Sequence, residues 1–207
     1  MTRATYVLAV LTAGAAAVAF ACAPARAAGI TGGGTAAILI GDDVDVEIDL
    51  DRARQGLSAG IYFSARAPNF EFRPEILYVE MGSGDQTLLP ALGAGPLEVD
   101  LDYVQVPFLF KLTSATDRQG GVGIFFGPYA AFNLDAKVTQ DVGGVPVTTD
   151  VKDLVRNTDV GAIVGLSIDG EYWSLDIRYT QGFENILEGS SLDVRNAAVS
   201  VMLGMSF

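Results

Sequence analysis

Hydrophobic and polar residues alternate with a period of two along most of the chain. Leu175 and Ile177, for example, alternate with Asp176 and Arg178. This is the period of a β-strand, whose successive side chains point to opposite faces. Most alternating or apolar segments have about the 9–11 residues that a tilted strand needs to cross a membrane. The pattern predicts eight strands and no helix, over residues 30–40, 56–66, 69–81, 100–112, 121–136, 158–168, 172–182 and 195–207.

The connections between these segments alternate strictly between short and long. An up-and-down barrel of the outer membrane has tight turns on its periplasmic side and longer loops outside. A soluble β-sandwich has no reason to sort its loops in this way. The short connections are residues 67–68, 114–119 and 169–171, and the long ones are 41–55, 82–99, 137–157 and 183–194.

The alternation itself fits both a soluble and a membrane protein. In water the apolar face of each strand points inward, whereas in a membrane barrel it faces lipid and the polar face lines the lumen. Loop parity, an export signal and the aromatic end at Phe207 together favour the membrane. We therefore expect an all-β fold, an eight-stranded antiparallel up-and-down transmembrane β-barrel whose last strand pairs with the first. Its predicted interfacial aromatic residues are Tyr78, Tyr103, Tyr129, Tyr172, Trp173 and Tyr179.

The N-terminus has the features of a secretory signal peptide. Arg3 precedes an apolar stretch over residues 6–20, and residues 25–27 read Ala-Arg-Ala, an A-x-A cleavage site. This predicts a signal peptide over residues 1–27 and a single barrel domain over residues 28–207. Two alternatives remain open, a lipoprotein acylated at Cys22 and an uncleaved N-terminal membrane helix.

Composition narrows the functional classes. The chain of 207 residues carries a formal charge of −12, which argues against a nucleic-acid partner, because phosphate binding needs clustered Lys and Arg. It has no histidine, and its one cysteine, Cys22, lies in the predicted signal peptide. Imidazole-dependent catalysis and the usual zinc or copper ligands are therefore missing. We expect no enzyme activity, no catalytic residue, no cofactor and no dedicated metal site. The glycines at residues 32–34 lack the Lys-Ser/Thr of a phosphate loop and are expected in the first strand.

Six ionic residues occupy the polar faces of three predicted strands. An eight-stranded barrel is just wide enough inside to be filled by side chains, and charges of mixed sign satisfy one another there. The favoured interpretation is a plugged lumen, and the alternative is a polar path for ions or small solutes. The predicted structural network in the lumen consists of Glu71, Arg73, Glu75, Lys111, Asp176 and Arg178.

An acidic run follows the first predicted strand. Its acids alternate with aliphatic residues and continue the parity of Thr35, Ala37 and Leu39, so an unbroken strand would carry them around the mouth of the barrel. Same-face acids on one strand lie too far apart to chelate one ion directly. The interpretations are a solvated rim, contact with anionic lipopolysaccharide through divalent cations, and contact with a protein partner. The predicted acidic outer rim consists of Asp43, Asp45, Glu47, Asp49 and Asp51.

Several segments resemble one family. DYVQVPFLFKL (residues 102–112) and FRPEILYVEMG (residues 72–82) resemble strands of the PorT-like outer-membrane β-barrel family, within the OmpX/OmpA-type eight-stranded barrels. GPYAAF, DVGAIVGLS and LDIRYTQGFENI resemble its later strands in the same order. The resemblance implies an outer-membrane location and recognition of the final strand, ending at Phe207, by the outer-membrane assembly machinery. It implies no particular activity.

These observations predict a structural or surface-interaction role in the outer membrane, in contact with its lipid and lipopolysaccharide. Two rival functions remain open. One is a narrow, porin-like diffusion channel, and the other is a secreted soluble barrel of lipocalin type that binds an apolar ligand.

Overall fold

The computed structural model describes residues 25–41, 53–86, 97–114, 120–141, 145–186 and 194–207. All but one of the elements in these ranges are strands. Their bounds are β1 Ala25–Ile40, β2 Arg54–Ala67, β3 Phe70–Gln86, β4 Leu97–Thr113, β5 Gly121–Asp141, β6 Pro146–Asp150, β7 Thr158–Asp169, β8 Trp173–Gly182 and β9 Arg195–Ser206, with a 3-10 turn η3 at Lys152–Leu154. Among the described residues, no helix is long and apolar enough to cross a membrane.

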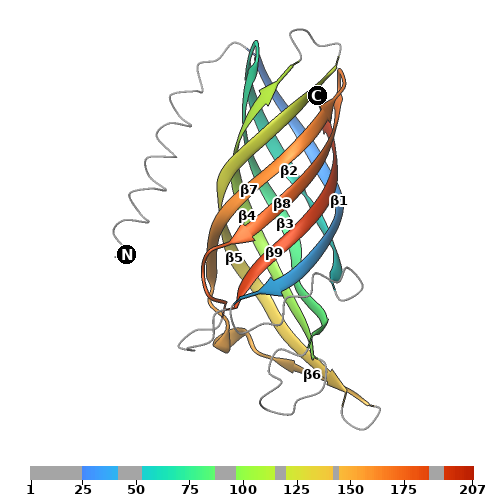
Figure 1. Ribbon diagram of the computed structural model, residues 1–207, viewed down its shortest axis with the longest axis vertical. Coiled ribbons are helices and arrows are strands. Elements are labelled where there is room, and N and C mark those ends of the chain that lie inside the picture. Colours follow the sequence, from blue (N-terminus) through green and yellow to red (C-terminus); the bar gives the residue numbers. More distant parts are fainter. Residues whose placement is uncertain (1–24, 42–52, 87–96, 115–119, 142–144, 187–193) are drawn as a thin grey trace, which may run out of the picture.

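Eight of the strands close into a barrel (Figure 1). Each pairs antiparallel with its neighbours in the chain, β6 excepted, and the barrel closes where β1 pairs with β9. Strand β6 stays outside the wall and pairs with the end of β5 alone among the described strands. The predicted eight-stranded antiparallel barrel is confirmed, whereas β6 and η3 were not anticipated.

The two ends of the barrel differ in their connections. The turns β2–β3, β4–β5 and β7–β8 lie at the end where the chain finishes, the upper end in Figure 1. The strand ends that the four longer connections join lie at the opposite end, where β5 and β6 project beyond the rest of the wall. The structure therefore has the loop parity that the sequence predicts. We refer to these as the short-turn end and the long-loop end.

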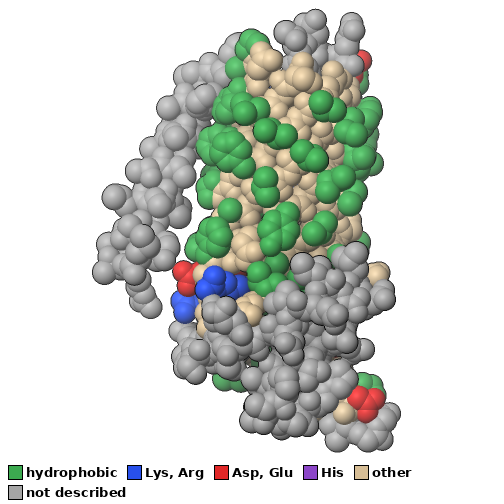
Figure 2. Space-filling view, viewed as in Figure 1, with side chains coloured by type: hydrophobic (Ala, Val, Ile, Leu, Met, Phe, Trp, Pro, Cys, Tyr) green, Lys and Arg blue, Asp and Glu red, His purple; other side chains and the backbone are tan. Residues whose placement is uncertain are grey.

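Burial alternates along the strands as their sequence does. In β8, Asp176 and Arg178 are buried while Ile177 and Tyr179 are exposed. The exposed positions of the wall are mainly apolar, and Figure 2 shows hydrophobic side chains over most of its height. Lys and Arg side chains are seen at the lower edge of this belt, toward the long-loop end. An apolar exterior around a polar interior is the arrangement of a membrane barrel, not of a lipocalin-type soluble one.

Two of the six predicted interfacial aromatics are not at the interface. Tyr103 and Tyr129 are buried inside the barrel, with 1% and 3% of their surfaces exposed. Tyr103 shares the parity of Gln105 and Lys111, which also face inward. The prediction was wrong for these two because it rested on residue type instead of strand parity. The other four, Tyr78, Tyr172, Trp173 and Tyr179, are exposed on the outer face.

Candidate functional site in the barrel lumen

Four charged side chains meet across the lumen. Arg178 donates to both carboxylate oxygens of Glu75, from Nη1 to Oε2 at 2.5 Å and from Nη2 to Oε1 at 3.0 Å. Its Nη2 also donates to Asp176 Oδ2 at 2.8 Å. Arg73 donates from Nε to Glu75 Oε1 at 2.7 Å and pairs through Nη2 with Asp176. Each acid therefore contacts both arginines, and we call these residues the ionic quartet.

The quartet spans the interior because its members come from strands that are not neighbours. Arg73 and Glu75 lie on β3, Asp176 and Arg178 lie on β8, and three strands separate β3 from β8 around the wall. Within each strand the two residues are two positions apart, so they point to the same face. All four are at most 3% exposed. Period-two alternation thus supplies one base and one acid from each side of the lumen.

Aromatic rings extend the packing around the quartet. The guanidinium carbon of Arg73 lies 4.9 Å from the centroid of the Tyr62 ring, and that of Arg178 lies 5.6 Å from the Phe125 ring. Both distances are within the range of a cation–π attraction. Tyr62 and Phe125 are themselves buried. The arginines are therefore held between carboxylates and ring faces, with few polar atoms left to water.

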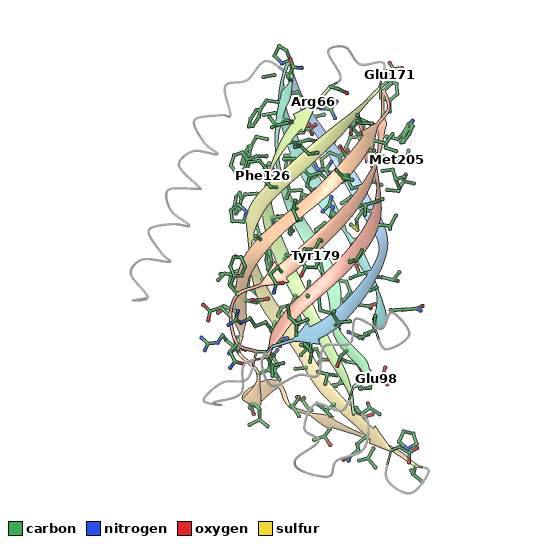
Figure 3. The ribbon with its side chains drawn as sticks, in the orientation of Figure 1. Arg66, Glu98, Phe126, Glu171, Tyr179 and Met205 are labelled. Carbon is green, nitrogen blue, oxygen red and sulfur yellow. The ribbon has the colours of Figure 1, made fainter. Side chains whose placement is uncertain are left out.

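The other two predicted network residues pair separately, nearer the short-turn end. Lys111 Nζ lies 2.5 Å from Asp169 Oδ1, and Arg66 Nε lies 3.1 Å from Glu71 Oε2. Figure 3 shows Arg66 near this end. Sequence reasoning missed Arg66 and Asp169, although Arg66 has the inward parity of Tyr62 and Ser64.

With these two pairs the network has equal numbers of acids and bases. We call all eight residues the ionic network: Glu71, Glu75, Asp169, Asp176, Arg66, Arg73, Lys111 and Arg178.

A second polar cluster lies farther along the lumen, toward the long-loop end. Tyr129 Oη donates to Asp159 Oδ2 at 3.0 Å, and Asn196 Nδ2 reaches the same oxygen at 3.4 Å. Asn196 Nδ2 also lies 3.3 Å from Tyr103 Oη. All four side chains are buried, and they come from β4, β5, β7 and β9. Sequence reasoning did not single out Asp159 or Asn196, because each stands at the start of a strand beside a long connection.

An apolar core fills the lumen from its middle to the long-loop end. It includes Leu39, Leu77 and Leu101, each at most 3% exposed. At the same end the outer face is charged: Arg54 Nε lies 2.6 Å from Asp100 Oδ1, and Asp135 lies 2.5 Å from Lys137. The polarity of the wall is thus reversed here, with apolar residues inside and ions outside, as in a soluble protein. Such a reversal is expected where the wall of a membrane barrel extends beyond the lipid.

Acidic residues alternate with aliphatic ones in two segments, residues 43–51 and residues 98–102, and the structure describes only the second. The predicted outer rim, Asp43 to Asp51, lies outside the described residues; β1 ends at Ile40, with Thr35, Ala37 and Leu39 buried as their parity predicts. Residues 98–102, at the start of β4, form the second of these segments. There Glu98 is exposed while Val99 and Leu101 are buried, and Glu98 lies at the long-loop end in Figure 3.

In one ion pair outside the apolar belt, between Asp135 and Lys137, each residue shifts the pKa of the other. Lys137 donates a hydrogen bond to Asp135, which lowers the pKa of this carboxyl, and the pKa of Lys137 is raised in return. Both side chains are substantially exposed, so solvent screens the pair. The pair makes the outer wall polar at the long-loop end.

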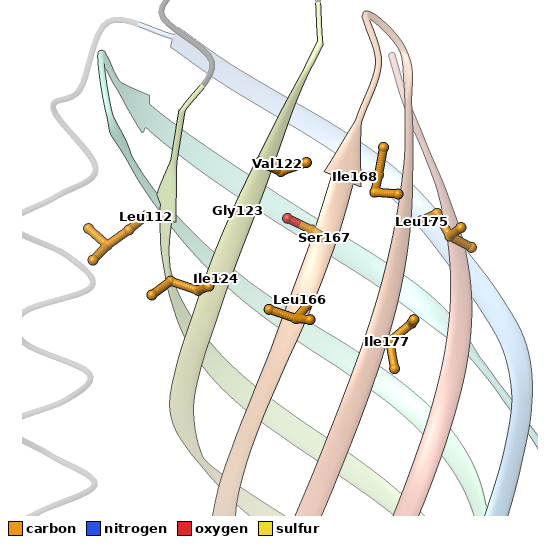
Figure 4. A pocket seen from close by; sticks show the side chains of 9 residues that line it. All are labelled: Leu112, Val122, Gly123, Ile124, Leu166, Ser167, Ile168, Leu175 and Ile177. Carbon is orange, nitrogen blue, oxygen red and sulfur yellow. The ribbon is translucent and has the colours of Figure 1, made fainter.

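The outer wall also carries a shallow groove of about 450 Å³ near the short-turn end (Figure 4). Aliphatic side chains project around it from four adjacent strands, β4, β5, β7 and β8. The lining residues are Leu112, Val122, Gly123, Ile124, Leu166, Ser167, Ile168, Leu175 and Ile177.

Closed strand order, an apolar exterior and an ionic lumen define the class of protein, an outer-membrane β-barrel. Residues 38–188 match the family described as "Outer membrane protein beta-barrel domain", and the chain belongs to this family. The match does not distinguish the PorT-like group from other members, so that finer resemblance stays a prediction. No curated protein matches the chain.

The solved structures to which the chain is similar have low sequence identity to it. Ail, the attachment invasion locus protein of Yersinia pestis, is 13% identical, with a TM-score of 0.49 over 87% of this chain and 98% of Ail. Neisserial surface protein A is 13% identical, with a TM-score of 0.48 over 88% of this chain and 99% of its own. The N-terminal β-barrel domain of Pseudomonas aeruginosa OprF is 9% identical, with a TM-score of 0.38 over 86% of this chain and 97% of that domain.

Proposed function

We propose that the protein is a non-conducting outer-membrane barrel with a structural or surface-interaction role. The observation that carries this proposal is the ionic quartet, which joins β3 to β8 through the middle of the lumen. A channel of eight strands has little width to spare, because side chains suffice to fill it. Here the side chains in that space are mutually paired and buried, which supports a plug and not a path.

The apolar core supports the same proposal. Beyond the quartet an ion would meet Leu77, Leu101 and their neighbours, which are nearly inaccessible to solvent. Moving an unpaired ion through a packed apolar layer is costly. Two different barriers, one ionic and one apolar, therefore lie in series along the lumen.

The long-loop end carries the features of an interaction surface. All five residues of β6 are exposed, and Val145, Val147 and Leu154 are among the exposed apolar side chains there. Within the described part of the chain, β6 pairs only with β5, so its other edge is not hydrogen-bonded to a described strand. An unprotected strand edge with apolar side chains is a surface on which another chain can pair. This end faces outward if the short turns are periplasmic, as in other outer-membrane barrels.

Contact with lipopolysaccharide belongs to the same proposal. The ion pairs Arg54–Asp100 and Lys137–Asp135 lie on the outer wall beside the lipid belt, at the height where headgroups begin. In the sequence, the acidic run Asp43 to Asp51 follows Ile40, where β1 ends. Divalent cations bridging these acids to lipid phosphates would stabilise the barrel in calcium, and an Asp43/Asp45/Glu47 triple Ala variant would lose that effect.

Conductance in planar bilayers tests the proposal against the channel alternative. We expect the full chain, folded in vesicles and fused into a bilayer, to give no stable current steps. A porin handled in the same way serves as the positive control. Reproducible unitary current steps from the wild-type protein would contradict the plugged barrel and support a diffusion channel.

A further inference from the structure

Strand β6 is the edge of a three-stranded sheet that extends beyond the barrel wall (Figure 1). Residues 97–100 of β4 pair with residues 137–140 of β5, and residues 146–150 of β6 pair with residues 137–141 on the other side of β5. All five residues of β6 are exposed. The side of β6 that faces away from β5 is therefore accessible, and we call it the outer edge of β6.

The backbone of Thr148 and Asp150 points toward this outer edge. Just beyond β6, the N–H group of Val151 donates to the backbone oxygen of Ala136 on β5 at 3.0 Å. Along an antiparallel ladder, residues that bond to the neighbouring strand alternate with residues that do not. Residues 147 and 149 therefore bond to β5, whereas Thr148 and Asp150 direct their N–H and C=O groups outward. These groups can bond to an added strand.

Charges alternate in sign across one face of the three-stranded sheet. Asp100, Lys137 and Asp150 are cross-strand neighbours on β4, β5 and β6. Asp100 pairs with Arg54, and the ammonium group of Lys137 donates its hydrogen bond to Asp135 and not to Asp150. Opposite charges in facing positions of two strands stabilise the pairing, and like charges destabilise it. The side chain that best continues this row beyond Asp150 is therefore basic.

The opposite face of the sheet is uncharged. One of its cross-strand rows consists of Val99, Val138 and Thr149, and the next row ends at Val147. Val147 is among the exposed apolar side chains. An aliphatic side chain beside Val147 or Thr149 would remove apolar surface from water. The two faces thus favour different residues, and these alternate along an added strand.

We propose that the outer edge of β6 binds an extended segment of another protein in which basic residues alternate with aliphatic ones. The basic side chains would lie on the face of Asp150, and the aliphatic side chains would lie beside Thr149 and Val147. The formal charge of −12 attracts such a segment at longer range. This proposal rests on the surface-interaction role proposed above and names the class of partner.

The charge pattern disfavours the chain itself as the occupant of this edge. Residues 43–51 also alternate, but their polar members are all acids, so they offer no base to Asp150. A second copy of β6 has the sequence Pro-Val-Thr-Thr-Asp and offers none either. A basic segment must therefore come from another protein.

Peptide binding to the full protein in zwitterionic detergent micelles tests this proposal. The probe is a fluorescently labelled synthetic peptide in which lysine alternates with valine, and empty micelles are the blank. The matched control peptide has the same composition with its lysines and valines in separate blocks, so that it has the same charge without the alternation. We expect saturable binding of the alternating peptide, measured by fluorescence anisotropy, and weaker binding of the block peptide.

Two variants of β6 separate backbone pairing from charge. Thr148→Pro removes an outward N–H group, which an edge strand tolerates, and should weaken binding of the alternating peptide by about tenfold. Thr148→Ala keeps this N–H group and should bind as the wild type does. Asp150→Lys should reverse the charge preference, so that a peptide alternating glutamate with valine binds better than the lysine peptide. The gel shift of the folded form verifies that each variant folds.

Three results would overturn the proposal. They are equal binding of the alternating and block peptides by the wild type, unchanged binding by folded Thr148→Pro, and an unchanged charge preference in Asp150→Lys. Self-association of the wild-type protein that Thr148→Pro abolishes would assign the edge to a second copy and would overturn it as well. The plugged lumen is tested separately, because only current steps in the planar bilayer contradict it.

Discussion

Arg178 on β8 holds both carboxylate oxygens of Glu75 on β3, so that one bidentate pair joins strands on opposite sides of the lumen. Asp176 and Arg73 complete the quartet with their own contacts. Such a pair adds geometric specificity as well as energy, because two parallel hydrogen bonds fix the orientation of both groups. The barrel is therefore stabilised by contacts across its lumen as well as by the hydrogen bonds between neighbouring strands.

Removing Arg178 should destabilise the barrel strongly. In Arg178→Ala, Glu75 and Asp176 retain only Arg73, and a buried acid loses its compensation. Breaking a buried ion pair in this way costs about 3–5 kcal/mol. The free energy of unfolding is measured by urea titration of the protein folded in lipid vesicles.

Arg156→Ala is the control for this experiment. Arg156 also pairs with an acid, Glu184, but the two groups are 3.4 Å apart and the Arg156 side chain is 40% exposed. An exposed pair contributes about 0–1 kcal/mol. Equal destabilisation by the two substitutions would argue against a buried network.

Two adjacent glycines of β1 should respond in opposite ways to alanine. A Cβ on Gly33 would lie 1.9 Å from the backbone oxygen of Val201 on β9, a contact that no side-chain movement relieves. A Cβ on Gly34 would meet nothing within 4 Å. We expect Gly33→Ala to lower the free energy of unfolding by about 1–3 kcal/mol or more.

Gly34→Ala should be neutral or stabilise by about 0.4–1 kcal/mol, because alanine restricts the unfolded chain and the site can accept it. Both variants are compared in the same urea titration. Similar behaviour of the two would show that β1 and β9 do not approach each other in this register. The comparison therefore tests the closure of the barrel directly.

A charge placed on the apolar belt should destabilise the folded barrel in the membrane. Val201 lies midway along β9, is 49% exposed and is flanked by Gly34 on β1 and Ile177 on β8. Arginine on the lipid face near the bilayer midplane costs about 2–4 kcal/mol.

The matched substitution is Val147→Arg on β6, where valine is 47% exposed at the long-loop end. For this variant we expect the free energy of unfolding to change by no more than about 0.5 kcal/mol, because the side chain is in contact with water in both the folded and the unfolded protein. Folding into vesicles is followed for both variants by the gel shift of the folded form. If Val201→Arg were tolerated as well as Val147→Arg, the outer face of β9 would not be in lipid.

The wall of the barrel could be predicted from the sequence because a membrane barrel imposes strict alternation on every strand. The parity of Thr35, Ala37 and Leu39, for example, agrees with the burial of β1. The β5–β6 ribbon could not be predicted, since all five residues of β6 are exposed and no buried face imposes a pattern.

It was harder to predict which charged residues pair with one another in the lumen than to predict which side chains face inward. All six predicted network residues point inward, but parity does not say which strands face each other, because that depends on the register around the closed barrel. Lys111 therefore pairs with Asp169, which sequence reasoning placed in a turn. Tyr103 and Tyr129 would have been assigned to the lumen by parity alone.

Electrophoretic migration of the protein from fractionated membranes tests the central claim, a closed barrel in the outer membrane. The protein is recovered in the outer-membrane fraction and run in SDS with and without heating. We predict that the unheated band migrates faster than the heated one, because the closed barrel stays compact in SDS until heat opens it. Recovery in the soluble fraction without detergent, with one position for both samples, would contradict the account.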